Sequence, residues 1–145
     1  MHVHASCAAR DGDGVLLLGP SGIGKSDLLL RLLAHGFQLV ADDQVEFEAG
    51  QASPPPALAG LLEVRGLGIV RMAHVAPVRV VLAVRLCGPN EAQSDRLPWR
   101  LSPEPELGLP VLTLDGSAAS APHRVALALD CATGRVEQLV GAFAA

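Results

Sequence analysis

The strongest constraint on the fold is a glycine-rich loop near the start of the chain, which reads Gly-Pro-Ser-Gly-Ile-Gly-Lys-Ser over residues 19–26. This loop follows the phosphate-loop pattern of Gly, four residues, Gly, Lys and Ser. The apolar residues 15–18 before it suit a buried strand. Residues 25–35 after it carry leucines on one broad face and end before Gly36, as a helix would. The order strand, loop, helix predicts an α/β fold with a nucleotide-binding core.

The residue types of this loop match the chemistry of a bound nucleoside triphosphate. Glycines let backbone amides curl around phosphate oxygens, and the helix N-terminus adds its positive end. Lys25 would meet the β- and γ-phosphates, and the Ser26 hydroxyl would hold magnesium. The alternative is an incidental glycine-rich turn, which the flanking strand and helix disfavour. We expect ATP and Mg²⁺ at Gly19, Pro20, Ser21, Gly22, Ile23, Gly24, Lys25 and Ser26.

The rest of the chain favours strands over helices. Residues 49–60 contain three successive prolines, and residues 88–106 contain four prolines, so both segments are expected to be surface loops. Residues 134–140 are ambiguous between helix and strand. Strands are expected at residues 37–41, 61–65, 68–72, 77–86, 111–114 and 124–130. We therefore expect one domain over residues 1–145, built on a mixed, strand-rich sheet.

Composition narrows the class of function. With 50% hydrophobic residues, a chain of 145 residues can bury a core. Aromatic residues make up 3% and the net charge is −4, so base stacking and attraction to phosphate backbones are both disfavoured, and we expect no nucleic-acid partner. No apolar run approaches a membrane span and residues 1–10 lack a signal-peptide pattern, so we expect a cytoplasmic protein without membrane contact. The widely spaced Cys7, Cys87 and Cys131 suggest buried thiols.

Two adjacent carboxylates, Asp42 and Asp43, follow the strand expected at residues 37–41. Phosphoryl transfer to a hydroxyl needs a carboxylate for the metal and a base for the proton. Neighbouring side chains of an extended chain point to opposite sides, so one carboxylate could face the phosphates while the other faces the acceptor or supports the first. The alternative is a polar strand exit at the surface. Further along, Glu63 and Arg65 could equally form a surface ion pair.

Four features together resemble the HPr kinase/phosphorylase family, the serine kinases that phosphorylate the phosphocarrier protein HPr of the sugar phosphotransferase system. His4 precedes the loop at the family's distance, and residues 19–26 match its Gly-x-Ser-Gly-x-Gly-Lys-Ser. Residues 39–43 match its Leu-Val-Ala-Asp-Asp, and residues 62–69 resemble its Leu-Glu-Ile-Arg-Gly-Leu-Gly-Ile. The resemblance covers the family's catalytic domain alone. It implies a core like that of this domain and of phosphoenolpyruvate carboxykinase.

The resemblance implies a role for most of the residues singled out above. Lys25 would bind phosphate, and Ser26 and Glu63 would hold Mg²⁺. Asp43, supported by Asp42, would accept the proton of the target serine. These assignments follow from alignment with the family and not from spacing alone.

Two further residues enter the expected site only through the resemblance. His4 would lie at the active site, although a histidine near a chain start is more often an ordinary surface residue. Arg96 resembles the family's later catalytic arginine, which would steady charge on the transferring phosphoryl group. The alternative for Arg96 is a solvated arginine in a polar loop.

The expected function is that of an ATP-dependent serine kinase with HPr or an HPr-like phosphocarrier protein as its partner. Residues 116–124 replace the family's Val-Arg-Pro-Gly-Arg-Asn segment, so we expect weak or absent phosphorylase activity. The C-terminal region is shorter than in full-length members, which leaves a homo-oligomer open. The alternatives are a nucleotide-sensing regulatory module, a kinase of another substrate and an ATPase.

Overall fold

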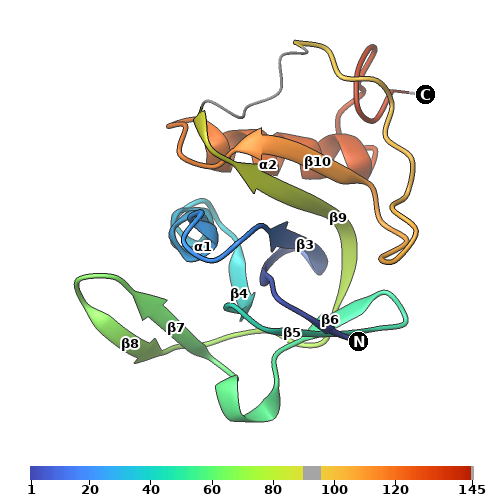
Figure 1. Ribbon diagram of the computed structural model, residues 1–145. Helices are drawn as coiled ribbons and strands as arrows, with labels where there is room; N and C mark the ends of the chain where they lie inside the picture. The colour runs from blue at the N-terminus through green and yellow to red at the C-terminus, as the bar shows by residue number, and fades with distance from the viewer. Residues whose placement is uncertain (90–95, 145) are drawn as a thin grey trace.

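The structure is a computed structural model that describes residues 1–89 and 96–144 (Figure 1). The helices are α1 (Lys25–Leu33), the 3₁₀ helix η1 (Pro56–Leu58) and α2 (Ala121–Ala132). The strands are β1 (His2–Val3), β2 (Ser6–Arg10), β3 (Asp13–Leu18), β4 (Gln38–Ala41), β5 (Val45–Glu48), β6 (Gln51–Ser53), β7 (Leu61–Val64), β8 (Gly68–Arg71), β9 (Val78–Cys87) and β10 (Val111–Asp115).

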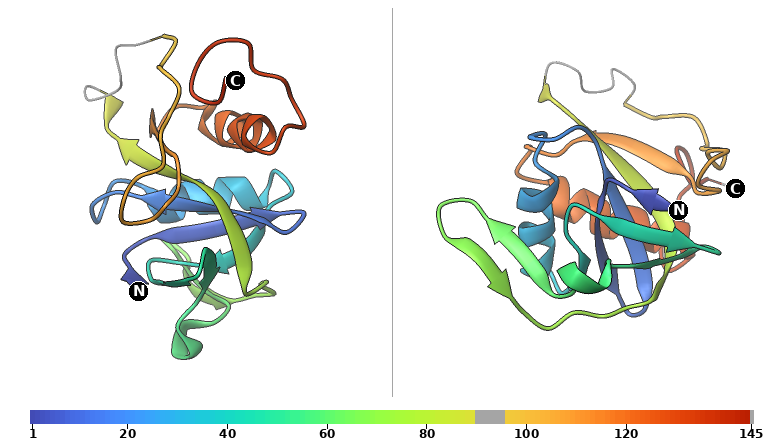
Figure 2. Two further views of the ribbon diagram at one scale, coloured as in Figure 1. Left: turned by 90° about the vertical axis from the view of Figure 1, so that its right-hand side faces the viewer. Right: turned by 60° about the horizontal axis from the view of Figure 1, so that its bottom comes forward.

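A mixed sheet organises the described residues, with strand order β1-β5-β6-β9-β3-β2-β4. Strand β9 runs parallel to β3 along one edge. On its other edge, the start of β9 pairs with β6 in antiparallel fashion and its end pairs with β10 in parallel fashion (Figure 2). The hairpin β7–β8 forms a separate small sheet. This strand-rich arrangement with helices confirms the predicted α/β fold class.

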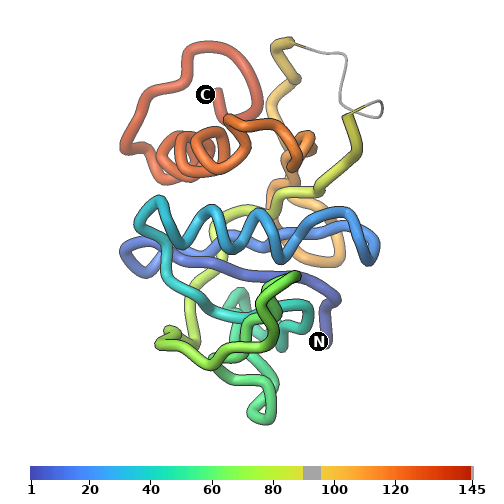
Figure 3. The backbone as a smooth tube through the Cα atoms, turned by 90° about the vertical axis from the view of Figure 1, so that its left-hand side faces the viewer, coloured from blue at the N-terminus to red at the C-terminus, as the bar shows by residue number. Residues whose placement is uncertain are grey.

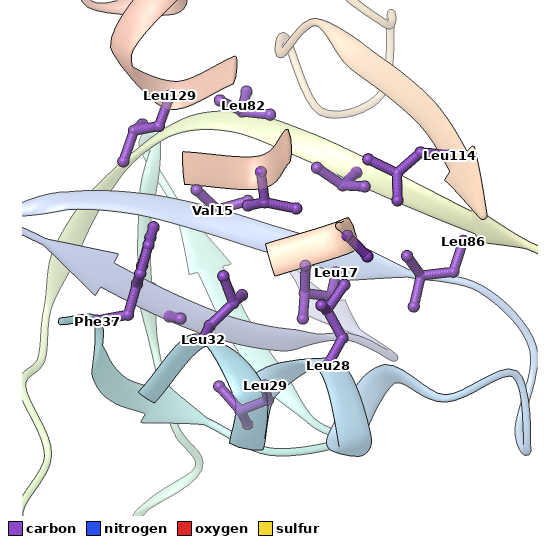
Figure 4. Packing of buried hydrophobic residues seen from close by; sticks show 14 of the residues in the cluster. Val15, Leu17, Leu28, Leu29, Leu32, Phe37, Leu82, Leu86, Leu114 and Leu129 are labelled. Carbon is purple, nitrogen blue, oxygen red and sulfur yellow. The ribbon is translucent and has the colours of Figure 1, made fainter. Parts of the chain in front are cut away.

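Helices α1 and α2 cover one face of the sheet, where the larger hydrophobic cluster lies (Figure 4). Helix α1 contacts both α2 and β7, and it runs between them in the view of Figure 3. The cluster draws on both helices and on the central strands, and its members include Val15, Leu17, Leu28, Leu29, Leu32, Leu82, Val84, Val125 and Leu129. The opposite face carries a second cluster that includes Leu16, Val40, Phe47, Val80 and Leu109. The larger cluster joins leucines of α1 to Val15 and Leu17 of β3, so it packs α1, and with it the end of the glycine-rich loop, against the sheet.

Most predicted elements are present at nearly the predicted places. Each strand expected at residues 15–18, 37–41, 61–65, 68–72, 77–86 and 111–114 corresponds to an observed strand. The helix expected over residues 25–35 spans Lys25–Leu33, and Gly36 after it has φ 85°. In the described part of the segment 88–106, an isolated bridge joins Pro103 to Pro110 and most other residues lie in loops. Residues 90–95 of that segment lie outside the described residues.

The strand expected at residues 124–130 is wrong, because this segment lies inside helix α2. Its buried residues recur at helical spacing, and they are Ala121, Pro122, Val125, Ala128 and Leu129. Pro122 is tolerated because it stands in the first turn, where its missing N–H has no helical partner to lose. Leu127 is apolar but exposed, so residues 125–129 form a continuous apolar run in the sequence. The helical spacing is seen only among the residues that are buried.

The surface loop expected at residues 49–60 is only partly correct. Gln51–Ser53 form β6, which pairs with both β5 and the start of β9, and Pro56–Leu58 form η1. A two-residue turn at Ala49 and Gly50 joins β5 to β6, with φ 52° and 78°, as tight hairpins require. The ambiguous residues 134–140 form neither a helix nor a strand in the structure.

Replacing a leucine at the centre of the larger cluster is expected to destabilise the fold strongly. Leu29 of α1 is 0% exposed, and Leu29→Ala should lower the free energy of unfolding by about 3 kcal/mol because it leaves a cavity. The neighbouring Leu30 is 41% exposed, so Leu30→Ala should cost far less. Urea denaturation of both variants measures the difference, and equal losses would contradict the packing described above.

Candidate active site

The glycine-rich loop connects β3 to α1 and has the backbone shape that its glycines permit. Gly24 lies immediately before α1 with φ 108°, and its carbonyl accepts the first helical hydrogen bond from Leu28 N at 3.0 Å. A Cβ atom at Gly19 would lie 2.8 Å from Ile23 Cγ2, so only glycine fits there. The sequence therefore folds locally into a loop whose end opens directly onto a helix N-terminus.

Lys25 is a nearly buried cation at the first position of α1, with 6% of its surface exposed. Its Nζ donates to the carbonyl oxygens of Gly19 at 2.7 Å and Pro20 at 3.1 Å. Among the ion pairs of the described residues, none involves Lys25. A buried ammonium group that has only neutral partners is well suited to bind an anion, because a bound phosphate would compensate its charge.

Asp42 lies directly against Ser26. Its Oδ1 accepts hydrogen bonds from Ser26 Oγ at 2.6 Å and from Ser6 Oγ at 3.0 Å, and its Oδ2 accepts from the backbone N–H of Glu63 at 3.2 Å. The carboxylate is thus held by three donors from β2, α1 and β7. The prediction paired Asp42 chiefly with Asp43, whereas the geometry also links it to the serine expected to hold the metal.

The oxygen atoms around Ser26 suit Mg²⁺, a hard cation that prefers oxygen ligands. Within the described residues, no group of three or more His, Cys, Asp or Glu side chains is arranged to hold a metal ion on its own. Mg²⁺ in phosphoryl-transfer sites usually has few protein ligands and completes its shell with phosphate oxygens and water. The hydroxyl of Ser26 and the carboxylates of Asp42 and Glu63 therefore fit a metal that arrives with a nucleotide.

Asp43 adopts a different conformation from its neighbour, with φ 69° in the left-handed region. The assumption of an extended chain at this position is therefore wrong. Its carboxylate is 59% exposed, and Oδ1 accepts a hydrogen bond from His4 Nε2 at 2.7 Å. Its backbone N–H donates to Ser6 Oγ at 3.2 Å, and its carbonyl accepts from Ala5 N at 3.1 Å. Asp43 is thus fixed through its backbone while its carboxylate stays accessible.

A hollow of about 440 Å³ brings most of the predicted site residues together. Its floor is the glycine-rich loop and the start of α1, and its wall is the end of β7 followed by Arg65. Of the residues predicted for chemistry, the hollow is lined by Lys25, Ser26, Asp43 and Glu63. The volume lies within the range usual for small-molecule sites. His4 joins this group through its hydrogen bond to Asp43.

Arg96 is not brought into this group of residues. It is exposed and lines a second hollow of about 360 Å³ together with Asp115 and Arg124. Of the described residues, those around the glycine-rich loop do not include it. In the second hollow, the hydroxyl and N–H of Ser117 lower the pKa of Asp115 by hydrogen bonding to its carboxylate. The role expected for Arg96 stays a prediction.

Three further findings concern the cysteines, Ser6 and the length of the helices. Cys7 is buried, as expected, and burial raises the pKa of its thiol to about 12, whereas Cys87 and Cys131 are only half-buried. Ser6 is fully buried and contacts both aspartates. It was not predicted as a site residue, because a single serine in a short strand belongs to no recognisable motif. No helix in the described ranges has the length and apolar character of a membrane span.

Comparison with known proteins identifies relatives of this chain. The profile of the HPr Serine kinase C-terminal domain matches residues 1–86. The HPr kinase/phosphorylase of Cupriavidus necator is 38% identical over 112 residues, which cover 69% of this chain and 35% of that protein. The HPr kinase/phosphorylase of Burkholderia cenocepacia is 34% identical over 142 residues, which cover 90% of this chain and 44% of that protein. The chain thus spans less than half the length of these relatives.

A solved structure shares the fold. The Hpr(Ser) kinase/phosphatase from Coxiella burnetii superposes with a TM-score of 0.77 at 26% sequence identity. The superposition covers 93% of this chain and 97% of that chain. The superposition agrees with the strand-rich α/β fold described above. The chain therefore belongs to the family of the HPr serine kinase C-terminal domain.

Proposed function

We propose that this chain is an ATP-dependent serine kinase whose acceptor is HPr or an HPr-like phosphocarrier protein. The observation that carries the proposal is the shared hollow, in which a phosphate-binding loop and an accessible carboxylate face the same space. The phosphate-binding groups are Lys25 and Ser26, and the carboxylate is Asp43. The names of the relatives, HPr kinase/phosphorylase, support the choice of acceptor.

The loop and α1 would hold the triphosphate of ATP. Lys25 would bind β- and γ-phosphate oxygens with its ammonium group, and the N-terminus of α1 adds partial positive charge. Ser26 and Glu63 would hold Mg²⁺, and Asp42 orients the Ser26 hydroxyl by accepting its hydrogen bond. When bound, Mg²⁺ neutralises charge on the phosphate oxygens.

Asp43 would act as the base. Its carboxylate accepts the proton of the acceptor serine while the serine oxygen attacks the γ-phosphorus, and the bond from this phosphorus to the β,γ-bridging oxygen breaks. His4 donates a hydrogen bond from Nε2 to Asp43 Oδ1, which leaves Oδ2 available for the serine. The product pair is ADP and phosphoserine.

The proposal covers the kinase direction only. Residues 116–124, which differ from the family segment tied to phosphorylase activity, form a turn that leads into the first residues of α2. Because these residues do not carry the family's Val-Arg-Pro-Gly-Arg-Asn pattern, we propose that phosphorolysis is weak or absent.

The test is transfer of label from γ-labelled ATP to HPr of the same organism in the presence of Mg²⁺. We expect label on one serine of HPr, located by mass spectrometry, and no label on HPr whose acceptor serine is replaced by alanine. Chelation of Mg²⁺ should abolish transfer. Release of labelled phosphate alone would indicate an ATPase. Tight ATP binding with no transfer would indicate a nucleotide-sensing module, and either result would overturn the proposal.

A further inference from the structure

Ser6 is an unusual residue for its position at the start of β2. It is 0% exposed, and among the described residues only Ser6 and Lys25 are buried polar or charged residues. The neighbouring residues Ala5, Cys7, Ala8 and Ala9 are small, apolar and equally buried. An alanine would fill this place without the cost of burying a hydroxyl group. The partners of the hydroxyl should therefore explain its presence.

Both partners of the Ser6 hydroxyl belong to the aspartate pair. The hydroxyl donates its proton to Asp42 Oδ1 at 3.0 Å and accepts the backbone N–H of Asp43 at 3.2 Å. A single buried oxygen atom thus links the side chain of one aspartate to the backbone of the next. Both hydrogen-bonding capacities of the group are used within the site.

The conformation of Asp43 makes this link significant. Its φ of 69° lies in a region that is unfavourable for residues other than glycine, although aspartate tolerates it better than most. Such a conformation persists where surrounding contacts hold it. Here β2 and the residue before it hold both sides of Asp43, since Ser6 accepts from its N–H and Ala5 N donates to its carbonyl at 3.1 Å.

We infer that Ser6 is a positioning residue that aligns the two carboxylates for phosphoryl transfer. Its hydroxyl holds Asp42 toward Ser26 and holds the backbone from which the carboxylate of Asp43 projects into the hollow. The inference rests on the proposed function for its catalytic consequence. The hydrogen bond from the Asp43 N–H to Ser6 Oγ, called the clamp below, can be measured without an assay of enzyme activity.

The first measurement is hydrogen exchange of the Asp43 amide in the purified chain. Ser6→Ala removes the acceptor, so exchange at this amide should become about tenfold faster, as expected for loss of one hydrogen bond. Ser6→Thr keeps the hydroxyl and should keep the protection. Cys7→Ala is the matched control, because Cys7 is the next residue of β2, is equally buried and directs its thiol to the carbonyl of Ala8 rather than to either aspartate.

The second measurement is the kinetics of transfer to HPr. Ser6→Ala should lower kcat by about 10- to 100-fold through misplacement of the base, with the KM for ATP changed by less than about threefold. Ser6→Thr should restore most of kcat, and Cys7→Ala should leave kcat close to that of the wild type. Melting temperatures of all variants separate this effect from a general loss of stability.

The outcomes separate the inference from the proposed function. Unchanged exchange at Asp43 in Ser6→Ala, or an unchanged kcat in a chain that phosphorylates HPr, would overturn the positioning role. Faster exchange in a chain that never transfers phosphate would contradict the proposed function but would support the clamp. Equal losses of kcat in Ser6→Ala and Cys7→Ala would show that β2 packing, and not the hydroxyl, is responsible.

Discussion

Asp43→Asn should lower the rate of phosphate transfer to a protein serine by about 10²- to 10⁴-fold, the usual contribution of a general base. Asparagine has almost the same shape and can still accept the hydrogen bond from His4, but it cannot take a proton at neutral pH. Because Asp43 lies beside the glycine-rich loop and not within it, ATP binding should be nearly unchanged. Single-turnover transfer of labelled phosphate to HPr and a titration with an ATP analogue measure the two effects.

Asp11→Asn is the matched control for this substitution. Asp11 is also an aspartate with positive φ, 53°, and its carboxylate is 66% exposed, but its partner is Arg135 and it lies away from the hollow. The same chemical change there should leave transfer within about twofold of the wild type. Transfer by Asp43→Asn at a rate close to that of the wild type would mean that another group accepts the serine proton.

Lys25→Met is expected to have the second large effect, with opposite consequences for the free and the nucleotide-bound protein. Methionine keeps the apolar stem but removes the nearly buried ammonium, whose partners are the carbonyls of Gly19 and Pro20. The free protein should melt at the same or a higher temperature, because a desolvated charge is lost. The rise in melting temperature caused by Mg²⁺ and ATP should disappear, and transfer should fall by about 10²- to 10³-fold.

The control for Lys25→Met is Arg31→Met on the same helix. Arg31 pairs with Asp27 at 3.0 Å and donates to the carbonyls of Gly116 and Ala118, so its loss should lower the melting temperature of the free protein. The rise caused by ATP should remain. A normal ATP response in Lys25→Met would show that the triphosphate binds elsewhere.

The order of β3, the glycine-rich loop and α1 could be predicted from the sequence because it depends on local pattern. A glycine pattern, a lysine and a serine within eight residues determine the backbone shape of the loop and predict a phosphate ligand. The two strands of the β7–β8 hairpin were also predicted, at residues 61–65 and 68–72, although their pairing was not. Here short-range pattern and final structure agree.

The parts that the sequence did not reveal depend on contacts between distant residues. The left-handed conformation of Asp43 is held by Ala5 and Ser6, which are more than 35 residues away. The hydrogen bond from Glu63 N to Asp42 similarly joins β7 to the residue after β4 only in the folded chain. Helix α2 was misread because alanine, leucine and valine fit either a buried strand or a buried helix, and packing against β9 and α1 decides between them. Local pattern could not supply this information.

The position of β9 in the sheet affects which substitutions the two halves of the chain can tolerate. The residues gathered around the hollow all precede β9 in sequence, whereas β10 and α2 follow it and attach to the core mainly through β9 and α1. Mutations after β9 therefore alter the lifetime of the folded state more than the shape of the hollow. Substitutions in the second half of the chain are therefore expected to be limited mainly by packing, since Val125 and Leu129 lie buried in the larger cluster.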